Sequence, residues 1–201
     1  MKRKGLIGGT FDPVHRGHIS LAVDAMEQAQ LDEVIFMPAG HQPFKLDKRI
    51  APAADRVAML KIAAAGVPGL AVSELETSSD EVSYTYLTLD RVRKMLGPDY
   101  RLYFITGTDT FLKLQIWRRS EELLSMNSFI VGSRPGYRED ELEKCIRAMK
   151  DIYGTETILI NNRRLDISAT EIRERAAAGE SITEMVPEGV EEYIKEHGLY
   201  K

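Results

Sequence analysis

Gly8-Gly9-Thr10-Phe11-Asp12-Pro13-Val14-His15-Arg16-Gly17-His18 follows a short apolar run, Gly5–Ile7, and precedes residues of helical period, Ile19–Ala29. This order predicts a turn between a buried strand and an amphipathic helix. Glycine backbone in such a turn tolerates left-handed angles and the close approach of a ligand. The first N–H groups of a helix carry partial positive charge. We therefore expect the turn to bind a phosphate group.

Two histidines stand at the expected start of the helix. His15 and His18 are three residues apart, so they share a face and can reach one phosphate. There they could donate hydrogen bonds to oxygens that gain charge during substitution at phosphorus. A glycine turn with two solvated histidines is one alternative, and a zinc site is another. The spacing differs from HExxH, and only His41 and His197 remain to complete a zinc site, so we expect no metal held by side chains.

Apolar runs recur along the chain, and residues of helical period separate most of them. This alternation predicts an α/β fold, a Rossmann-like doubly wound parallel sheet flanked by helices. The length of 201 residues fits a single domain, residues 1–201. In such a sheet, ligands bind beyond the carboxyl ends of the strands. The expected strands are Gly5–Ile7, Glu33–Met37, Ala71–Leu75, Arg101–Ile105, Ser128–Val131 and Thr157–Ile160.

Composition narrows the class of protein. The net charge is −4 and no long basic run occurs, which argues against a nucleic-acid surface. The single cysteine, Cys145, excludes an internal disulfide, and its helical spacing with Leu142, Ile146, Met149 and Ile152 predicts a packing role. No span approaches the ~20 apolar residues that a bilayer requires. We expect a cytoplasmic protein with no membrane partner, and the sequence leaves a homo-oligomer open.

A second motif, Asp166-Ile167-Ser168-Ala169-Thr170-Glu171-Ile172-Arg173, lies near the end of the chain. Ser168 followed by Glu171 predicts a capping box, which is a structural role. The Arg173 guanidinium, within the next turn and a half, could also reach a phosphate held near the helix start. We expect helices over Ser168–Ala178 and Pro187–His197. No Walker A or GxGxxG sequence occurs, so if a nucleotide binds, the turn and this helix start must hold its phosphates.

Together these two motifs resemble the signatures of the HxGH nucleotidyltransferase superfamily, and the GGTFDPVH form is similar to bacterial nicotinate mononucleotide adenylyltransferases. The resemblance extends over most of the chain. It implies transfer of AMP from ATP to nicotinate mononucleotide, giving deamido-NAD and pyrophosphate in NAD biosynthesis. Mg²⁺ would be bound through the ATP phosphates. The catalytic residues would be His15, His18 and Arg173.

The resemblance also implies an ATP site that the C-terminal helices, about residues 167–201, complete. Its expected residues are Ile7, Gly8, Gly9, Thr10, Phe11, His15, His18, Gly107, Asp109, Arg134, Ile167, Ser168, Thr170 and Arg173.

The expected residues of the second substrate site are Lys45, Ser83, Thr85, Tyr86, Asp109, Trp117 and Arg118. By resemblance, Trp117 stacks on the pyridine ring and Asp109 accepts hydrogen bonds from ribose. The backbone N–H groups of Tyr86 and Arg118 receive the nicotinate carboxylate. A pocket of N–H donors rejects an amide, whose NH₂ group would face donors, so we expect the acid to be preferred over the amide.

One loop departs from the family. Gln42-Pro43-Phe44-Lys45 stands where the family commonly has Pro-Pro-His-Lys. Phe44 therefore occupies the position of a family histidine, and the nearby His41 could take over the role of that histidine. Three other functions stay open: transfer to nicotinamide mononucleotide, transfer to phosphopantetheine, and a nucleotide-binding sensor without turnover.

Overall fold

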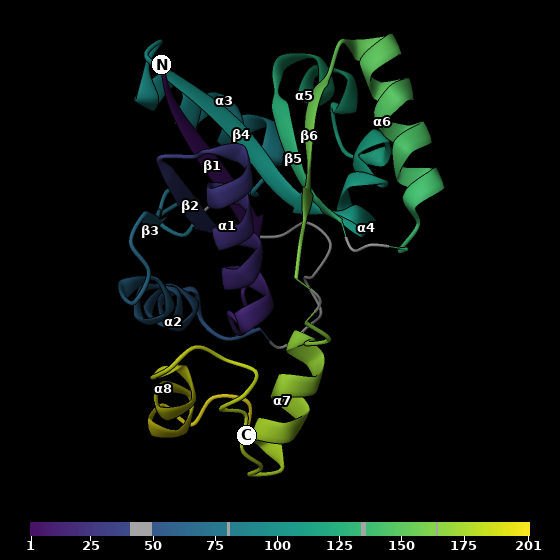
Figure 1. Cartoon of the computed structure of the whole chain (residues 1–201). Coiled ribbons are helices and arrows are strands. Elements are labelled where there is room, and N and C mark those ends of the chain that lie inside the picture. The colour runs from purple at the N-terminus through teal and green to yellow at the C-terminus, as the bar shows by residue number, and fades with distance from the viewer. Residues whose placement is uncertain (41–49, 80, 134–135, 164) are drawn as a thin grey trace.

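A six-stranded parallel sheet forms the centre of the protein (Figure 1). The computed structural model describes residues 1–40, 50–79, 81–133, 136–163 and 165–201. The strand order is β3-β2-β1-β4-β5-β6. This order confirms the Rossmann-like doubly wound fold predicted from the alternation of apolar runs. The strands are β1 (Lys2–Gly9), β2 (Glu33–Pro38), β3 (Leu70–Val72), β4 (Tyr100–Gly107), β5 (Ser128–Ser133) and β6 (Glu156–Asn161).

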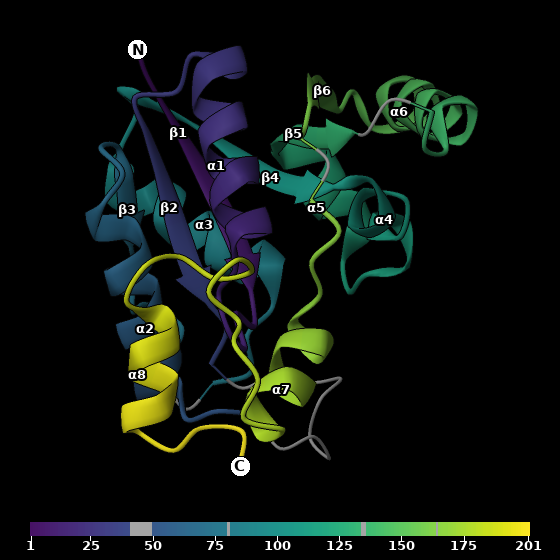
Figure 2. The same ribbon diagram turned by 60° about the horizontal axis from the view of Figure 1, so that its bottom comes forward.

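Helices cover both faces of the sheet (Figure 2). One face packs against α1 (Arg16–Ala29) and α2 (Ala53–Ala65), and α7 (Ala169–Ala177) and α8 (Val190–Glu196) extend this cluster. The other face packs against α3 (Thr85–Leu96), α4 (Thr108–Phe111), η1 (Leu114–Ile116), α5 (Ser120–Met126) and α6 (Glu139–Tyr153). In the described part of the chain, no helix combines the length and apolar character needed to cross a membrane.

Consecutive strand residues point to opposite faces and so divide the core in two. On β1, Leu6 belongs to the cluster with α3 to α6, whereas Ile7 belongs to the cluster with α1 and α2. On β4, Phe104 likewise belongs to the cluster with α3 to α6, and Ile105 belongs to the cluster with α1 and α2. Both faces of the central strands are buried, which explains why residues 104–106 of β4 and 129–131 of β5 are continuous buried runs rather than alternating ones.

The strand order reverses direction at β1. From β1 the chain first proceeds to β2 and β3 on one side, and then returns to β4 beside β1. Leu6 pairs with Phe104 in this junction. The carboxyl ends of β1 and β4, at Gly9 and Gly107, therefore flank the switch point, where open α/β sheets bind ligands.

Some predicted boundaries were wrong. Helix α8 begins at Val190, not at Pro187, because Gly189 adopts a left-handed φ of +81° and so interrupts the helical backbone. Helix α1 begins at Arg16, one turn before Ile19, because His15 is its N-cap. On α6, Ile152 is 65% exposed, while Leu142 and Met149 are buried in the core. Cys145 packs against the same core, as predicted.

Helix α1 is also joined to β6, the edge strand of the sheet. The Gln28 side chain donates to the Asn161 carbonyl over 2.8 Å and accepts from the Asn161 N–H over 2.9 Å. One turn earlier, the buried Asp24 carboxylate accepts from the Asn162 amide and from the Arg163 N–H. These bonds fix the helix that starts at the histidines against the last strand.

Candidate active site

The turn after β1 is packed around a buried phenylalanine. Phe11 adopts a left-handed φ of 52°, and its ring lies edge-on to Phe36, with centroids 5.5 Å apart. A Cβ at Gly9 would approach the Phe11 ring to 3.0 Å, so a side chain there would have to displace the ring. The ring also lies edge-on to His18, at 4.9 Å. Phe11 thus supports the histidine that follows it.

The two histidines form one unit at the start of α1. Their rings are stacked, with centroids 3.7 Å apart and planes 24° apart. The His15 N–H donates to Nδ1 of His18 over 3.2 Å. Because Nδ1 of His18 accepts this bond, the neutral ring carries its proton on Nε2. His18 can therefore donate a hydrogen bond from Nε2 to a ligand.

Burial keeps both imidazoles uncharged in the free protein. It lowers the pKa of His15 from 6.5 to about 4. Burial also lowers the pKa of His18 well below 6.5, and the neighbouring His15 lowers it further. Nδ1 of His15 is buried and has no hydrogen-bond partner among the described residues. A bound anion would reverse these shifts, because a nearby negative charge favours the imidazolium.

Gly17 makes room for His15. A Cβ at this position would lie 3.1 Å from Cε1 and Nδ1 of the His15 ring. Any side chain at position 17 would therefore have to displace that ring. This close approach explains why a glycine separates the histidines.

Not every N–H at the helix start is free for an anion. The Arg16 N–H donates to the Met185 carbonyl over 2.9 Å, and the His15 N–H is held by His18. The N–H groups of His15 and Arg16 are therefore engaged within the protein, and an anion at this helix start would have to bind other donors, such as Nε2 of His18.

Arg173 brings the second motif to the first. Its Nη1 donates to the Asp12 carbonyl over 2.7 Å and lies 3.7 Å from Oδ2 of the Asp12 carboxylate. Its Nη2 donates to Oγ1 of Thr170 over 3.3 Å. The guanidinium is partly exposed. Asp12 of the first motif and Arg173 of the second, which are 161 residues apart in the sequence, are therefore in direct contact.

Arg56 is a structural residue of the site that the sequence reading missed. Its side chain is 4% exposed, and its three nitrogens donate to the carbonyls of Ala51, Thr10 and Ala39 over 3.0, 2.7 and 2.8 Å. Burial lowers its pKa, and the nearby Asp12 raises it. The signal was an arginine within the apolar stripe of α2, beside Leu60 and Ala63. Such a buried charge requires hydrogen-bond partners.

The remaining residues of the two motifs have structural as well as candidate binding roles. Ile7 is buried in β1, and the Thr10 carbonyl is held by Arg56. Ile167 packs against the core. Oγ of Ser168 accepts from the Glu171 N–H over 3.1 Å and so caps α7, as predicted.

A second group of predicted residues lies beyond β4. Gly107 is the N-cap of α4, and Asp109 follows in its first turn. Oδ1 of Asp109 accepts from the Tyr137 hydroxyl over 3.1 Å and from Nη1 of Arg138 over 3.0 Å. The Asp109 side chain is 60% exposed, so its other carboxylate lone pairs lie at the surface.

The predicted acceptor residues come from two neighbouring segments. Nη1 of Arg118 donates to the Tyr84 hydroxyl over 2.9 Å, and its guanidinium lies 4.7 Å from the Tyr84 ring centre. Trp117 packs edge-on to Phe104, with centroids 6.5 Å apart. Thr85 and Tyr86 open α3 directly after Tyr84. The start of α3 and the segment around Trp117 are therefore side by side.

Ser83 links this region to the end of β2, since its Oγ accepts from the Gly40 N–H over 3.1 Å. Lys45, with the neighbouring His41 and Phe44, and Arg134 lie outside the described residues. Within the described ranges, no three histidine, cysteine or acidic side chains are grouped so that they could hold a metal ion.

Comparisons with known proteins identify the family. The cytidylyltransferase-like family profile matches residues 6–175. A probable nicotinate-nucleotide adenylyltransferase of Clostridium botulinum (strain Alaska E43) is 40% identical over 100% of this chain and 99% of its own length. The corresponding protein of Thermoanaerobacter (strain X514) is 37% identical, over 99% of this chain and 94% of its own.

A solved structure shares the fold. Plasmodium falciparum nicotinic acid mononucleotide adenylyltransferase, complexed with NaAD, superposes with a TM-score of 0.81 at 23% identity. The match covers 100% of this chain and 98% of that one.

Proposed function

This chain belongs to the nicotinate-nucleotide adenylyltransferases of the cytidylyltransferase-like family, and we propose that it transfers AMP from ATP to nicotinate mononucleotide. The products are deamido-NAD and pyrophosphate. The observation that carries the proposal is the contact between Arg173 and Asp12, which places the second motif against the turn with the two histidines. In this proposal the segment from about residue 167 to 201 completes the ATP site.

ATP would lie across the carboxyl ends of β1 and β4. Gly8 is exposed at the end of β1, where it offers backbone without a side chain. Nε2 of His18, the His15 ring and the Arg173 guanidinium are the donors for the phosphate oxygens. Thr170 and Ser168 stand at the start of α7, where the helix dipole also favours negative charge.

The reaction needs no general base, because the attacking phosphate of nicotinate mononucleotide is already anionic. One of its oxygens forms a bond to the α-phosphorus of ATP, and the bond from that phosphorus to the pyrophosphate oxygen breaks. Charge that builds on the phosphate oxygens raises the pKa of each histidine and strengthens its hydrogen bond. Catalysis thus depends on position and electrostatic stabilisation.

Mg²⁺ would be held by the phosphate oxygens of ATP and by water. The groups around the turn fit this arrangement. They are hydrogen-bond donors, which bind phosphate oxygens, and they are not the oxygen ligands that would bind Mg²⁺ directly. The nearest buried carboxylate, Asp12, is already engaged by an N–H, a hydroxyl and Arg173. The ion would supply charge neutralisation on the phosphates.

Nicotinate mononucleotide would lie on the other side of the switch point. Trp117 offers a half-buried aromatic face for the pyridine ring, and Asp109 offers a carboxylate for ribose hydroxyls. The backbone N–H groups of Tyr86 and Arg118 are the proposed donors to the nicotinate carboxylate. Such donors would select the acid over the amide.

The test is pyrophosphate release from ATP and Mg²⁺, measured with nicotinate mononucleotide and nicotinamide mononucleotide in parallel. We expect kcat/KM for the acid to exceed that for the amide by about 10²-fold or more, because the amide NH₂ group would face the N–H donors of Tyr86 and Arg118 and leave them unpaired. A preparation without either acceptor measures background ATP hydrolysis.

Preference for the amide would contradict the carboxylate pocket but retain adenylyl transfer. Release with neither acceptor, in a protein that still binds ATP, would contradict the proposed function.

A further inference from the structure

The turn with the two histidines contains a carboxylate whose surroundings are unusual. Asp12 is 6% exposed. Its Oδ1 accepts from the Ala51 N–H over 3.1 Å and from the Tyr200 hydroxyl over 2.8 Å. Its Oδ2 faces Nη1 of Arg173 at 3.7 Å, which is longer than a direct hydrogen bond. The carboxylate is therefore held away from a neighbouring guanidinium by donors on its other oxygen.

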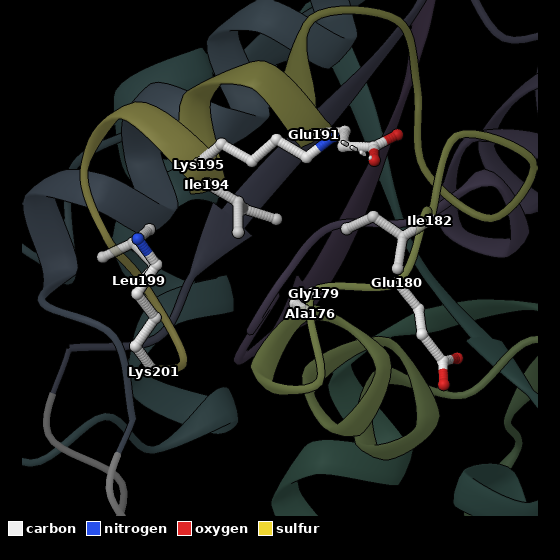
Figure 3. A pocket seen from close by; sticks show the side chains of 9 residues that line it. All are labelled: Ala176, Gly179, Glu180, Ile182, Glu191, Ile194, Lys195, Leu199 and Lys201. Carbon is white, nitrogen blue, oxygen red and sulfur yellow. Dashed lines mark hydrogen bonds and ion pairs between the residues drawn. The ribbon is translucent and has the colours of Figure 1, made fainter.

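The donor Tyr200 is placed by its own segment of chain. The Leu199 N–H donates to the Ile194 carbonyl over 3.0 Å, and Gly198 has a left-handed φ of 61°. Figure 3 shows Leu199 and Ile194 lining a pocket between α7 and α8. Tyr200 itself has a φ of 68°, a conformation that side chains rarely adopt. The packing of Leu199 thus directs Tyr200 toward Asp12.

In the hydrogen bond between Tyr200 and Asp12, the tyrosine hydroxyl carries the proton. Burial raises the pKa of the Tyr200 hydroxyl, and the Asp12 charge raises it further. The hydroxyl therefore stays protonated and acts as the donor. Two cations oppose the carboxylate charge: Arg173 at Oδ2 and the buried Arg56.

We propose that Tyr200 is a positioning residue for ATP, because its hydroxyl holds the Asp12 carboxylate in an orientation that leaves Arg173 available to the triphosphate. This proposal rests on the function proposed above, in which Arg173 binds ATP. Without the hydroxyl, Oδ1 loses one of its two donors and the carboxylate can turn toward the guanidinium. A charge-assisted bidentate pair between Asp12 and Arg173 would then compete with the phosphates.

The chain offers a matched control for the loss of this hydroxyl. The Tyr193 hydroxyl, seven residues earlier on α8, donates to Oδ1 of Asp55 over 2.9 Å. Tyr193→Phe therefore removes the same type of bond from the same segment but leaves Asp12 untouched. Asp55 lies on α2, outside the proposed ATP site.

The experiment measures the Kd for ATP with Mg²⁺ by titration calorimetry, together with Tm, in the wild type, Tyr200→Phe and Tyr193→Phe. We expect Tyr200→Phe to raise the Kd about tenfold, a typical effect of losing a hydrogen bond to a charged group. Tyr193→Phe should lower Tm comparably and leave the Kd unchanged. Steady-state KM for nicotinate mononucleotide should stay within about twofold in both variants.

A second measurement identifies the route through Arg173. In an Arg173→Ala background, adding Tyr200→Phe should raise the Kd by less than about twofold, because the competing guanidinium is gone. Equal Kd values for the two tyrosine variants, or full additivity with Arg173→Ala, would overturn the inference. Because ATP binding is measured directly, these outcomes are separate from failure of the proposed function, which appears as ATP binding without pyrophosphate release.

Discussion

The two sides of the switch point are built in different ways. On the ATP side, Phe11, Asp12 and Val14 are buried and the histidine rings are stacked on each other. On the acceptor side, Asp109 and Arg118 are exposed, and their contacts to Arg138 and Tyr84 lie at the surface. Buried, mutually supported groups hold their geometry, whereas exposed ion pairs and cation–π contacts contribute little in water. Under the proposed function, the phosphate side would thus be organised before ligand binds, and the acceptor side would be organised by its substrate.

The largest expected effect is at His18. In His18→Asn, Oδ1 of asparagine can accept the His15 N–H in place of Nδ1, but the Nε2 donor is lost. We expect kcat to fall about 10²- to 10³-fold, as when one transition-state donor is removed, with Tm unchanged. His18→Ala should lose the same activity and also lower Tm, because the His15 N–H then lacks its acceptor. Turnover and thermal unfolding of both variants measure the two roles separately.

Near-normal turnover in His18→Asn would contradict the catalytic role. Equal Tm values for the two variants would show that Nδ1 contributes nothing to stability.

On the acceptor side we expect a smaller effect, which changes KM for nicotinate mononucleotide and leaves ATP binding unchanged. Trp117→Ala should raise KM for nicotinate mononucleotide about tenfold through loss of ring stacking. The Kd for ATP should not change, because Trp117 packs with Phe104 in the core cluster of one sheet face, whereas Phe11, which contacts His18, belongs to the cluster of the other face. Initial rates with each substrate varied in turn provide the measurement.

Ile116→Ala is the matched control, since the Ile116 side chain is 83% exposed beside Trp117. If this variant raised KM as much as Trp117→Ala, the effect would belong to the segment and not to stacking. If Trp117→Ala instead raised the Kd for ATP, the division into two sides would be wrong.

The smallest expected effect is the pH dependence of stability from the ATP side. The pKa of His15 is about 4 in the folded protein and about 6.5 when unfolded. Between these values the unfolded chain binds more protons, so the stability present above pH 6.5 is lost as pH falls toward 4. We expect a loss on the order of 1 kcal/mol from His15 between pH 7 and pH 5, reduced by its partial exposure. Urea unfolding at both pH values provides the measurement.

In His15→Asn, which has no titrating ring, the loss between pH 7 and pH 5 should be smaller than in the wild type. An identical pH dependence would contradict a buried, neutral His15 in the free protein.

Local sequence predicted most of the fold and the position of the turn with the two histidines. Apolar runs identified the six strands, and the glycine and histidine spacing identified the turn, because these features depend on neighbouring residues. Ser168 was predicted as a cap for the same reason, and it caps α7. The predicted helix start at Pro187 was wrong because the left-handed backbone of Gly189 interrupts the helix, and the exposure of Ile152 depends on tertiary packing rather than on its helical spacing.

The residues that support the turn were beyond prediction from local pattern. Arg56 is 46 residues from the Thr10 carbonyl that it holds, and Tyr200 is 188 residues from Asp12. Only the folded chain brings these partners together. Arg56 left a trace as a charge in an apolar stripe, whereas nothing in the sequence around Tyr200 indicates its partner.

The Gln28 side chain has a second role, at the edge of the sheet, that is unrelated to the reaction. An edge strand exposes unpaired N–H and C=O groups that can pair with another chain and start aggregation. At Asn161, the end of β6, both groups are occupied by the Gln28 amide, which imitates the peptide group of a neighbouring strand. An incoming strand would have to displace two hydrogen bonds at this position. Near its C-terminal end, the helix that begins with the histidines thus occupies this one position of the edge strand, where another chain could otherwise pair.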